Sequence, residues 1–359
     1  MASLTQRSFL SRNAEHLGMA AMCVAVLVCS GLFVDGFATP KNASGLLLAT
    51  STVGILCCSM LLCLVSGDFD LSLGSVVALA GMVAAVVSNK TGSALAGLGA
   101  GLGAGLAVGA VNGFVVAFLR INPLITTLAT MQISRGLAYI IGDGKTLSVE
   151  VADFAKLGGS FQIPWGVNDA GDPVHVALGY PVLVMVGCLF IFGILLHFSV
   201  FGRSVLAMGG NEEAARLAGI PVRRTRLLVF MLQGLMAGLA GVLLTARLQT
   251  AAPQAEIGLE LKVMSACVLG GVALTGGRGT ILAIIWGMLI MGTVQRAMDL
   301  KQVGIYWQYV VSGSILLVAV IVDRFKTGFG GTTVGWYARL FKGGISGFVK
   351  ETIKQGIKK

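Results

Sequence analysis

The sequence predicts an all-α integral membrane protein with about ten transmembrane helices. Of its 359 residues, 55% are hydrophobic and only 12% are charged, whereas soluble domains carry about 25% charged residues. Apolar runs recur along the chain, and each is close to the roughly 20 residues that a helix needs to cross a bilayer. These runs are much longer than the alternating segments of a membrane barrel strand, so helices are favoured.

Ten apolar runs are interpreted as spans, in order along the chain. They cover residues 17–34, 44–66, 71–88, 94–118, 123–141, 180–199, 227–248, 259–275, 280–298 and 304–322. The first run follows Arg7 and Arg12 without a small-residue cleavage site, which indicates a retained signal-anchor helix. An even number of spans would place both termini on the same side of the membrane.

Basic residues predict the orientation of these spans. Lys and Arg collect in cytoplasmic loops because they resist translocation, and the chain has a net charge of +10. Arg120, Arg278 and the loop 203–226 would then be cytoplasmic, as would both termini, including the N-terminal segment 1–16. The acidic connection 142–179 would lie outside as an irregular segment with one short amphipathic helix. Nucleic-acid binding is not indicated, since the sequence has no basic, aromatic-bearing soluble module.

The order of the spans allows an inverted repeat. Spans two to five and spans seven to ten enter the membrane from opposite sides, which is the geometry of inverted repeats. The sequence echo is short, with the residues GAVN at 109–112 set against GTVQ at 292–295. The order and the echo allow a repeat but do not require it.

Glycines recur at every fourth position of the fourth span. They are Gly97, Gly101, Gly105, Gly109 and Gly113. Such a small-xxx-small face lets a neighbouring backbone approach closely, so we expect a helix-packing seam. The interleaved glycines never complete a dinucleotide-binding G-x-G-x-x-G fingerprint.

The chain has few residues that could carry covalent chemistry. Its seven cysteines all lie in apolar runs and its three histidines are scattered, so no metal site or cofactor is expected. Gly144, Lys145 and Thr146 end like a phosphate-binding loop, but Tyr139 stands where that motif requires glycine. We therefore expect the chain not to be an enzyme.

A short surface helix is predicted in the cytoplasmic loop 201–221. Asn211 can cap its start, and Gly219 can end it. Small side chains, those of Ala214, Ala215 and Ala218, would be exposed and would suit docking into a groove of another protein. An ordinary connecting helix is the alternative. The candidate docking residues are Gly210, Glu212, Glu213, Ala214, Ala215, Gly219 and Pro221.

This loop resembles the EAA loop of ABC importer permeases. Residues 213–215 read EAA, Gly219 follows after three more residues, and the lead at 202–211 reads GR-x5-GGN. Three further segments are similar to monosaccharide-type permeases: SGDFDLS at 66–72, ITTLATM at 125–131, and LGGV at 269–272 followed by GGRG at 276–279. The resemblance covers residues 17–325 as a permease domain and is nearest to the L-arabinose branch.

The resemblance implies a partner set and a location. Permeases of this family work as homodimers in the cytoplasmic (inner) membrane, with two cytoplasmic ATPase domains and a periplasmic sugar-binding protein. ATP would be hydrolysed on the separate ATPase subunit, and the EAA loop would be the element that couples it to alternating access. Ribose, xylose or another monosaccharide stays open as the substrate, since the binding protein mainly sets specificity.

Polar residues at membrane depth are costly and are functional candidates by default. Asp68 and Asp70 form either a turn that caps the next helix or a break inside the bundle. An ion-coupled secondary transporter, the rival class, would have to use these two carboxylates. Amide groups suit a neutral sugar, so the substrate-pathway candidates are Asp68, Asp70, Asn112, Gln132 and Arg135, some of which could instead bond between helices.

The segment 326–359 departs from the resemblance, because it is longer than this family leads one to expect. It alternates apolar and basic residues. One interpretation is a basic amphipathic cytoplasmic tail on anionic membrane lipid. The other is a frayed tail, since its glycines weaken a helix.

Overall fold

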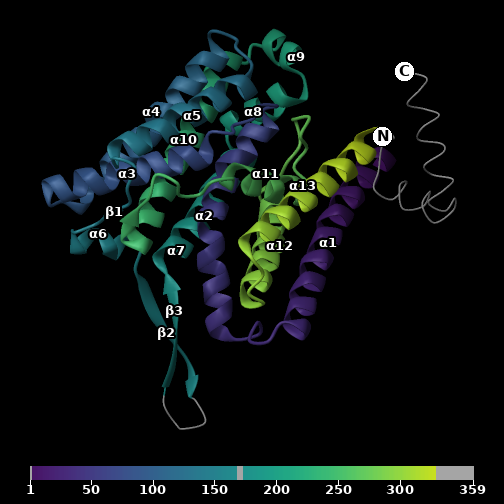
Figure 1. The fold of residues 1–359 in the computed structure, drawn as a ribbon. Coiled ribbons are helices and arrows are strands. Elements are labelled where there is room, and N and C mark those ends of the chain that lie inside the picture. Colours follow the sequence, from purple (N-terminus) through teal and green to yellow (C-terminus); the bar gives the residue numbers. More distant parts are fainter. Residues whose placement is uncertain (1, 168–172, 329–359) are drawn as a thin grey trace.

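A computed structural model of the protein describes residues 2–167 and 173–328, which are mainly helical (Figure 1). The helices are α1 (Ala2–Phe33), α2 (Pro40–Val65), α3 (Leu73–Thr91), α4 (Ala94–Ala117), α5 (Pro123–Ile141), α6 (Ala152–Leu157), α7 (Tyr180–Phe198), α8 (Val200–Gly210), α9 (Glu212–Leu217), α10 (Val222–Leu248), α11 (Leu259–Leu269), α12 (Ile281–Leu300) and α13 (Ile305–Gly328). Two antiparallel strand pairs join β1 (Leu147–Ser148) to β4 (Thr250–Ala251) and β2 (Ser160–Val167) to β3 (Pro173–Gly179). The predicted tail lies outside the described residues from position 329 onward.

Eight helices in the described part of the chain are long and apolar enough to cross a membrane. They are α2, α3, α4, α5, α7, α10, α12 and α13. Local signals set their starts: the Thr39 side chain accepts the backbone N–H of Asn42 before α2, and Asn122 caps α5 just before Pro123. The predicted class, a helical protein with multiple membrane spans, is thereby confirmed.

The predicted count of about ten spans is not confirmed. Helix α11 has 11 residues and rises about 16 Å, roughly half of the 30 Å hydrocarbon core. It stops at Gly270 because the next residue, Gly271, has a φ of +102° and redirects the chain. Run 259–275 is therefore not one spanning helix. In α1, the apolar stretch Leu17–Phe33 is shorter than the eight spans.

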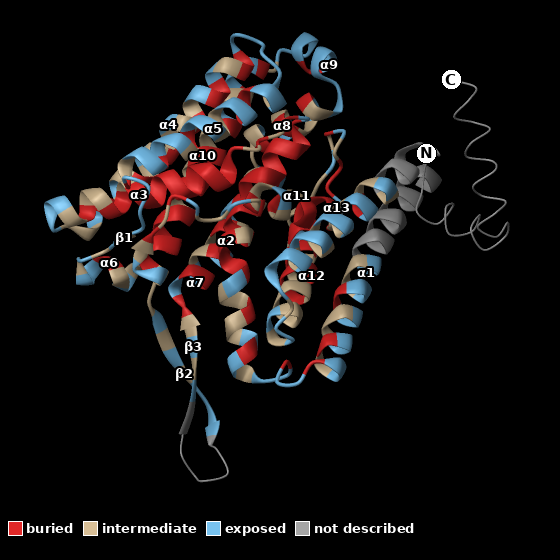
Figure 2. Ribbon diagram, viewed as in Figure 1, coloured by how far each residue is buried: buried red, intermediate tan, exposed pale blue. Residues whose placement is uncertain are grey.

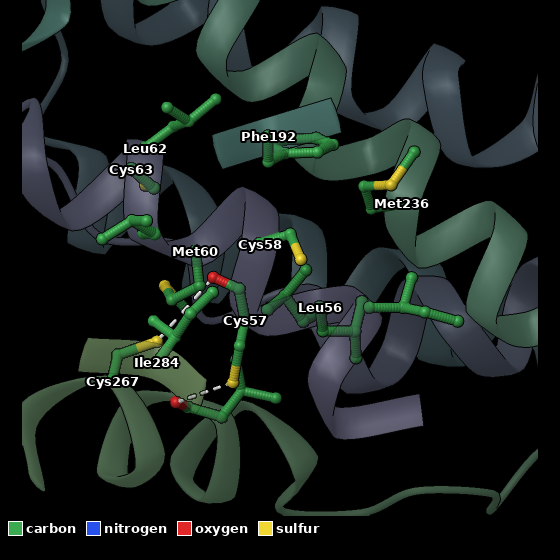
Figure 3. Packing of buried hydrophobic residues seen from close by; sticks show 14 of the residues in the cluster. Leu56, Cys57, Cys58, Met60, Leu62, Cys63, Phe192, Met236, Cys267 and Ile284 are labelled. Atoms are coloured by element: carbon green, nitrogen blue, oxygen red, sulfur yellow. Dashed lines mark hydrogen bonds between the residues drawn. The ribbon is translucent and has the colours of Figure 1, made fainter. Parts of the chain in front are cut away.

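Helix α2 lies at the centre of the hydrophobic core. Every residue from Gly54 to Val65 is buried, by side chains from α7, α10, α11 and α12 among others (Figure 2). Figure 3 shows the sulfur-rich part of this packing, where the Cys57 thiol donates to the carbonyl of Val263 at 3.8 Å and Cys267 donates back to the carbonyl of Cys57 at 3.9 Å. These cysteines thus join α2 to α11 as packing residues.

The glycine face of α4 lies against α3 and α10. A Cβ atom added at Gly105 would overlap the carbonyl oxygen of Gly234 in α10, and one at Gly109 would overlap that of Phe230. In contrast, Gly99 and Gly103 on the opposite face have open space around them. The glycines that recur at every fourth residue therefore mark the packed face of α4, and the interleaved glycines mark its outer face.

The connection between α5 and α7 is more regular than predicted. It contains the one short helix, α6, and a hairpin of β2 and β3, where an irregular segment was expected. Phe161, Ile163 and Trp165 alternate with other residues along β2, which is the period of a strand. In Figure 1 this hairpin and the α1–α2 connection lie at one end of the molecule, while the start of α1 and helix α9 lie at the other.

The α4 seam leads to a paired test. We expect Gly105→Ala to destabilise the protein by about 1–3 kcal/mol, because a methyl group there overpacks a backbone contact. Gly103→Ala is the matched control and should leave stability unchanged or slightly raised. Thermal unfolding in detergent measures both, and equal melting temperatures would show that the seam does not hold α4 on α10.

Candidate functional site

Helix α9 is a short surface helix with defined ends. The Asn211 side chain accepts the backbone N–H of Ala214 at 2.9 Å and so caps its start. At its other end Gly219 has a φ of +85°, and the N–H of Ile220 donates to the carbonyl of Ala215 at 3.1 Å. This is a glycine-terminated Schellman turn, and the left-handed residue is cheap only for glycine.

The exposed face of α9 differs from the predicted one. Ala214 and Ala218 are exposed as expected, but Ala215 is only 5% exposed and packs on the protein itself. Leu217 is instead 81% exposed. Successive helix residues turn by 100°, so Ala215 lies on a different side of α9 from Ala214. The sequence alone does not say which side of a six-residue helix faces the core. A bulky substitution at Ala215 would test packing and not docking.

Arg226, the fifth residue of α10, joins α9 to the end of α2. Its Nε donates to Asp68 Oδ2 at 2.8 Å, and its Nη2 donates to Glu212 Oε2 at 2.8 Å. The Asp68 and Arg226 side chains are 4% and 16% exposed, while Glu212 is 55% exposed. We call this group the Arg226 bridge. Glu213, in contrast, makes a surface pair with Arg216 at 3.6 Å.

The two carboxylates of the Arg226 bridge differ in their environments. Burial raises the pKa of Asp68, and the charge and hydrogen bond of Arg226 oppose that shift. The hydrogen bond from Arg226 lowers the pKa of the more exposed Glu212. Arg226 therefore favours the charged form of Asp68 against the effect of burial, whereas Glu212 is also exposed to solvent.

The α2–α3 connection is irregular and buried. Helix α2 ends in a second glycine-terminated turn, in which Gly67 has a φ of +82° and the N–H of Asp68 donates to the carbonyl of Cys63 at 3.0 Å. Asp68 and Asp70 are 3% and 2% exposed. Asp70 Oδ1 accepts the backbone N–H of Ser72 at 2.8 Å and its hydroxyl at 2.6 Å. The acids therefore lie in a buried break between α2 and α3, in which Asp70 also forms a turn onto Ser72, the residue that precedes α3.

Glycines from three motifs meet beside this break. They are Gly67, Gly209, Gly210, Gly276 and Gly277, and we call them the glycine junction. The N–H of Gly277 donates to the carbonyl of Val65 at 2.8 Å. A Cβ atom at Gly209 would overlap that same carbonyl oxygen, and one at Gly276 would lie 3.0 Å from the Cα of Gly67. The ends of α2 and α8 and the α11–α12 connection are thus in backbone contact.

The remaining pathway candidates are not brought together. Asn112 is fully buried, and its side-chain nitrogen donates to Ser72 Oγ at 3.1 Å. Its side-chain oxygen, Oδ1, has no partner among the described residues. Arg135 donates to the carbonyls of Pro253 and Ala255 at 2.6 and 2.8 Å, so it holds a loop. Gln132 lies on the exposed face of α5. Only Asn112 joins the Asp68–Asp70 segment.

Comparison with known proteins identifies the family. Residues 42–320 match the family described as "Branched-chain amino acid transport system / permease component". The chain belongs to this permease family. The permease is 51% identical over 312 residues to the L-arabinose transport system permease protein of Escherichia coli, covering 87% of this chain and 91% of that protein.

Two further relatives place the permease within the family. It is 43% identical to the L-arabinose ABC transporter permease protein of Azospirillum brasilense, over 86% of this chain and 87% of that one. The ribose import permease protein of Escherichia coli is 37% identical, over 87% and 94%. The permease is therefore a multi-pass membrane subunit of a transport system and not itself an enzyme.

Sequence reasoning missed three residues of the permease that the geometry singles out. Gly209, and not its neighbour Gly210, is the residue at which an added Cβ atom would overlap another backbone. Leu217 presents the largest exposed apolar side chain of α9. In the sequence Arg226 contributes only to the positive charge of the loop 203–226, although an arginine five residues into a spanning helix is itself a hint of a buried partner.

The glycine junction can be tested with adjacent residues. Gly209→Ala should destabilise the permease by about 1–3 kcal/mol through overlap with Val65. Gly210→Ala should have no such effect, since nothing lies within 4 Å of the added carbon. Melting temperature and monodispersity in detergent are the measurements. A stable Gly209→Ala protein would mean that the three segments are not in close contact.

Proposed function

We propose that the chain is the membrane permease of an ATP-driven, binding-protein-dependent importer of L-arabinose. The observation that carries the proposal is the higher identity of this chain to two L-arabinose permeases than to the ribose permease. Importers of ribose, xylose or another monosaccharide would use the same machinery and are the main alternative.

The partners and the location follow from the same proposal. The permease would form a homodimer in the cytoplasmic (inner) membrane, with two ATPase domains on the inside and a sugar-binding protein on the periplasmic side. Both termini would be cytoplasmic. Supporting this orientation, α9 and the start of α1 lie at one end of the molecule and the β2–β3 hairpin lies at the other (Figure 1). Lipid would contact the outer helices, of which α13 is the most exposed.

Helix α9 is the proposed coupling element. It combines a fixed, capped backbone with an exposed apolar side chain at Leu217 and small side chains at Ala214 and Ala218. Such a helix suits insertion into a groove of an ATPase subunit. Glu213 and Gly219 lie at its two ends, and Gly210 and Pro221 flank it.

An inverted repeat is proposed from the order of the elements. The 26-residue helix α2 and the 27-residue helix α10 are each followed by an irregular segment and then by a further helix. Each long helix is also followed by a left-handed residue, Gly67 or Gln249. These parallels support related halves, each with a break that could move during alternating access.

An ion-coupled secondary transporter is the rival class. It would need a carboxylate free to bind a proton or Na⁺. Asp68 is already paired with Arg226, and Asp70 accepts two hydrogen bonds from Ser72. This bonding disfavours the rival, which also gives no role to the exposed face of α9.

Uptake in reconstituted liposomes tests the proposed function. With its ATPase and an L-arabinose-binding protein, the permease should accumulate L-arabinose only when ATP is supplied to the ATPase. Vanadate should abolish uptake and a protonophore should not. Ribose and xylose, each in place of L-arabinose, are the substrate controls. Uptake that resists vanadate but stops with the protonophore would instead establish the rival class.

A second experiment tests the role of α9. Ala218→Trp should prevent co-purification of the ATPase, because packed interfaces tolerate little added volume, a cost of about 1–3 kcal/mol or more. Lys156→Trp on α6 is the matched control, since α6 is also a six-residue surface helix but lies at the other end of the molecule. If the Ala218 variant retains the ATPase and normal uptake, α9 is not the docking helix.

A further inference from the structure

The Arg226 bridge connects a surface element to a buried one through a single side chain. Nε and Nη2 of Arg226 belong to one planar guanidinium group and bind Asp68 and Glu212, each at 2.8 Å. Glu212 is the first residue of α9, and Asp68 is the first residue after the glycine turn that ends α2. Because the two nitrogens cannot move independently, displacement of Glu212 rotates the group that holds Asp68 for as long as the hydrogen bond to Glu212 persists.

Besides its covalent links to α8 and α10, α9 has few side-chain contacts with the membrane helices. Ala215 is the one buried residue of α9. The end of α8, just before α9, is held by backbone contact at the glycine junction. A force on α9 therefore reaches the bundle through its covalent links to α8 and α10, through the Ala215 contact and through the Arg226 bridge. Of these routes, only the bridge ends on a buried charge.

The buried end of the bridge continues into the bundle. After Asp68 the chain passes through Asp70 to Ser72, whose hydroxyl donates to Asp70 and accepts from Asn112 of α4. Asn112 keeps one buried oxygen without a partner in the described part of the chain. A change at Asp68 can therefore alter a polar segment that contacts Asn112, whose side-chain oxygen is available to accept a further hydrogen bond.

We infer that Arg226 is a positioning residue that transmits movement of α9 to the buried break between α2 and α3. This inference rests on the proposed function, in which an ATPase moves α9. Arg226 itself binds neither the ATPase nor the sugar under this inference. It couples the position of the α2–α3 break to the position of α9, so that each cycle of ATP hydrolysis changes access to the substrate pathway.

The test compares sugar transported per ATP hydrolysed. Arg226→Lys keeps the charge, but one ammonium cannot reproduce the two separate nitrogens of the bridge. We expect the ATPase to co-purify as before and hydrolysis to continue, while L-arabinose moved per ATP falls by about tenfold. Arg224→Lys is the matched control, because Arg224 is an exposed neighbour in the same turn, and it should keep the normal ratio.

A second variant guards against loss of the fold. Asp68→Asn/Arg226→Gln removes the buried pair as a unit, so neither member keeps a charge without its partner, and the protein should fold, as its melting temperature will show. Its transport per ATP should fall as in Arg226→Lys. A normal ratio in either folded variant would overturn the inference, as would loss of the ATPase from both. Absence of ATP-driven uptake by the unaltered permease would overturn the proposed function itself.

Discussion

Close contact between backbones, which glycine alone permits, sets the arrangement of helices in this permease. The contact between α4 and α10 has no side chain between Gly105 and Gly234. A second such contact joins α11 to α12, where Cβ atoms at Gly270 and Gly287 would overlap the carbonyls of Ala283 and Ala266. Apolar side chains have no preference for one another over lipid, so dispersion at such short range must provide the specificity.

The same contacts make irregular backbone tolerable in the interior. A break in a membrane helix leaves carbonyls and N–H groups that lipid cannot satisfy. At the end of α2 the carbonyl of Val65 is satisfied by Gly277, and Asp68 obtains its counter-charge from Arg226. The glycine junction therefore lies beside the buried position at which Asp68 is held. Packing and electrostatics are linked at this one position.

Prediction from the sequence succeeded where local signals decide the structure. The apolar runs 44–66 and 123–141 marked α2 and α5 within a few residues, and Gly219 marked the end of α9. Long-range partners could not be predicted. Arg226 and Asp68 are 158 positions apart, and nothing local states that they meet.

Other differences have equally physical causes. Helix α11 looked like a span because its apolar run continues past Gly270, although the helix does not. The inward side of α9 depends on how α8 and α10 present it to the core, so the burial of Ala215 could not be inferred. The β2–β3 hairpin was missed because its strand-like alternation lies within a polar segment that was interpreted by composition.

The central position of α2 has a consequence for the order of assembly. The helix is made second, but the elements that enclose it include α10, α11 and α12, which emerge from the ribosome much later. Until then the polar side chains of α2 lack these neighbours. Its hydroxyl groups are suited to that interval, because Thr50, Ser51 and Ser59 donate to carbonyls of their own helix, those of Leu46, Leu48 and Leu56. Biogenesis of this subunit thus requires a core helix that is stable alone before it becomes a core.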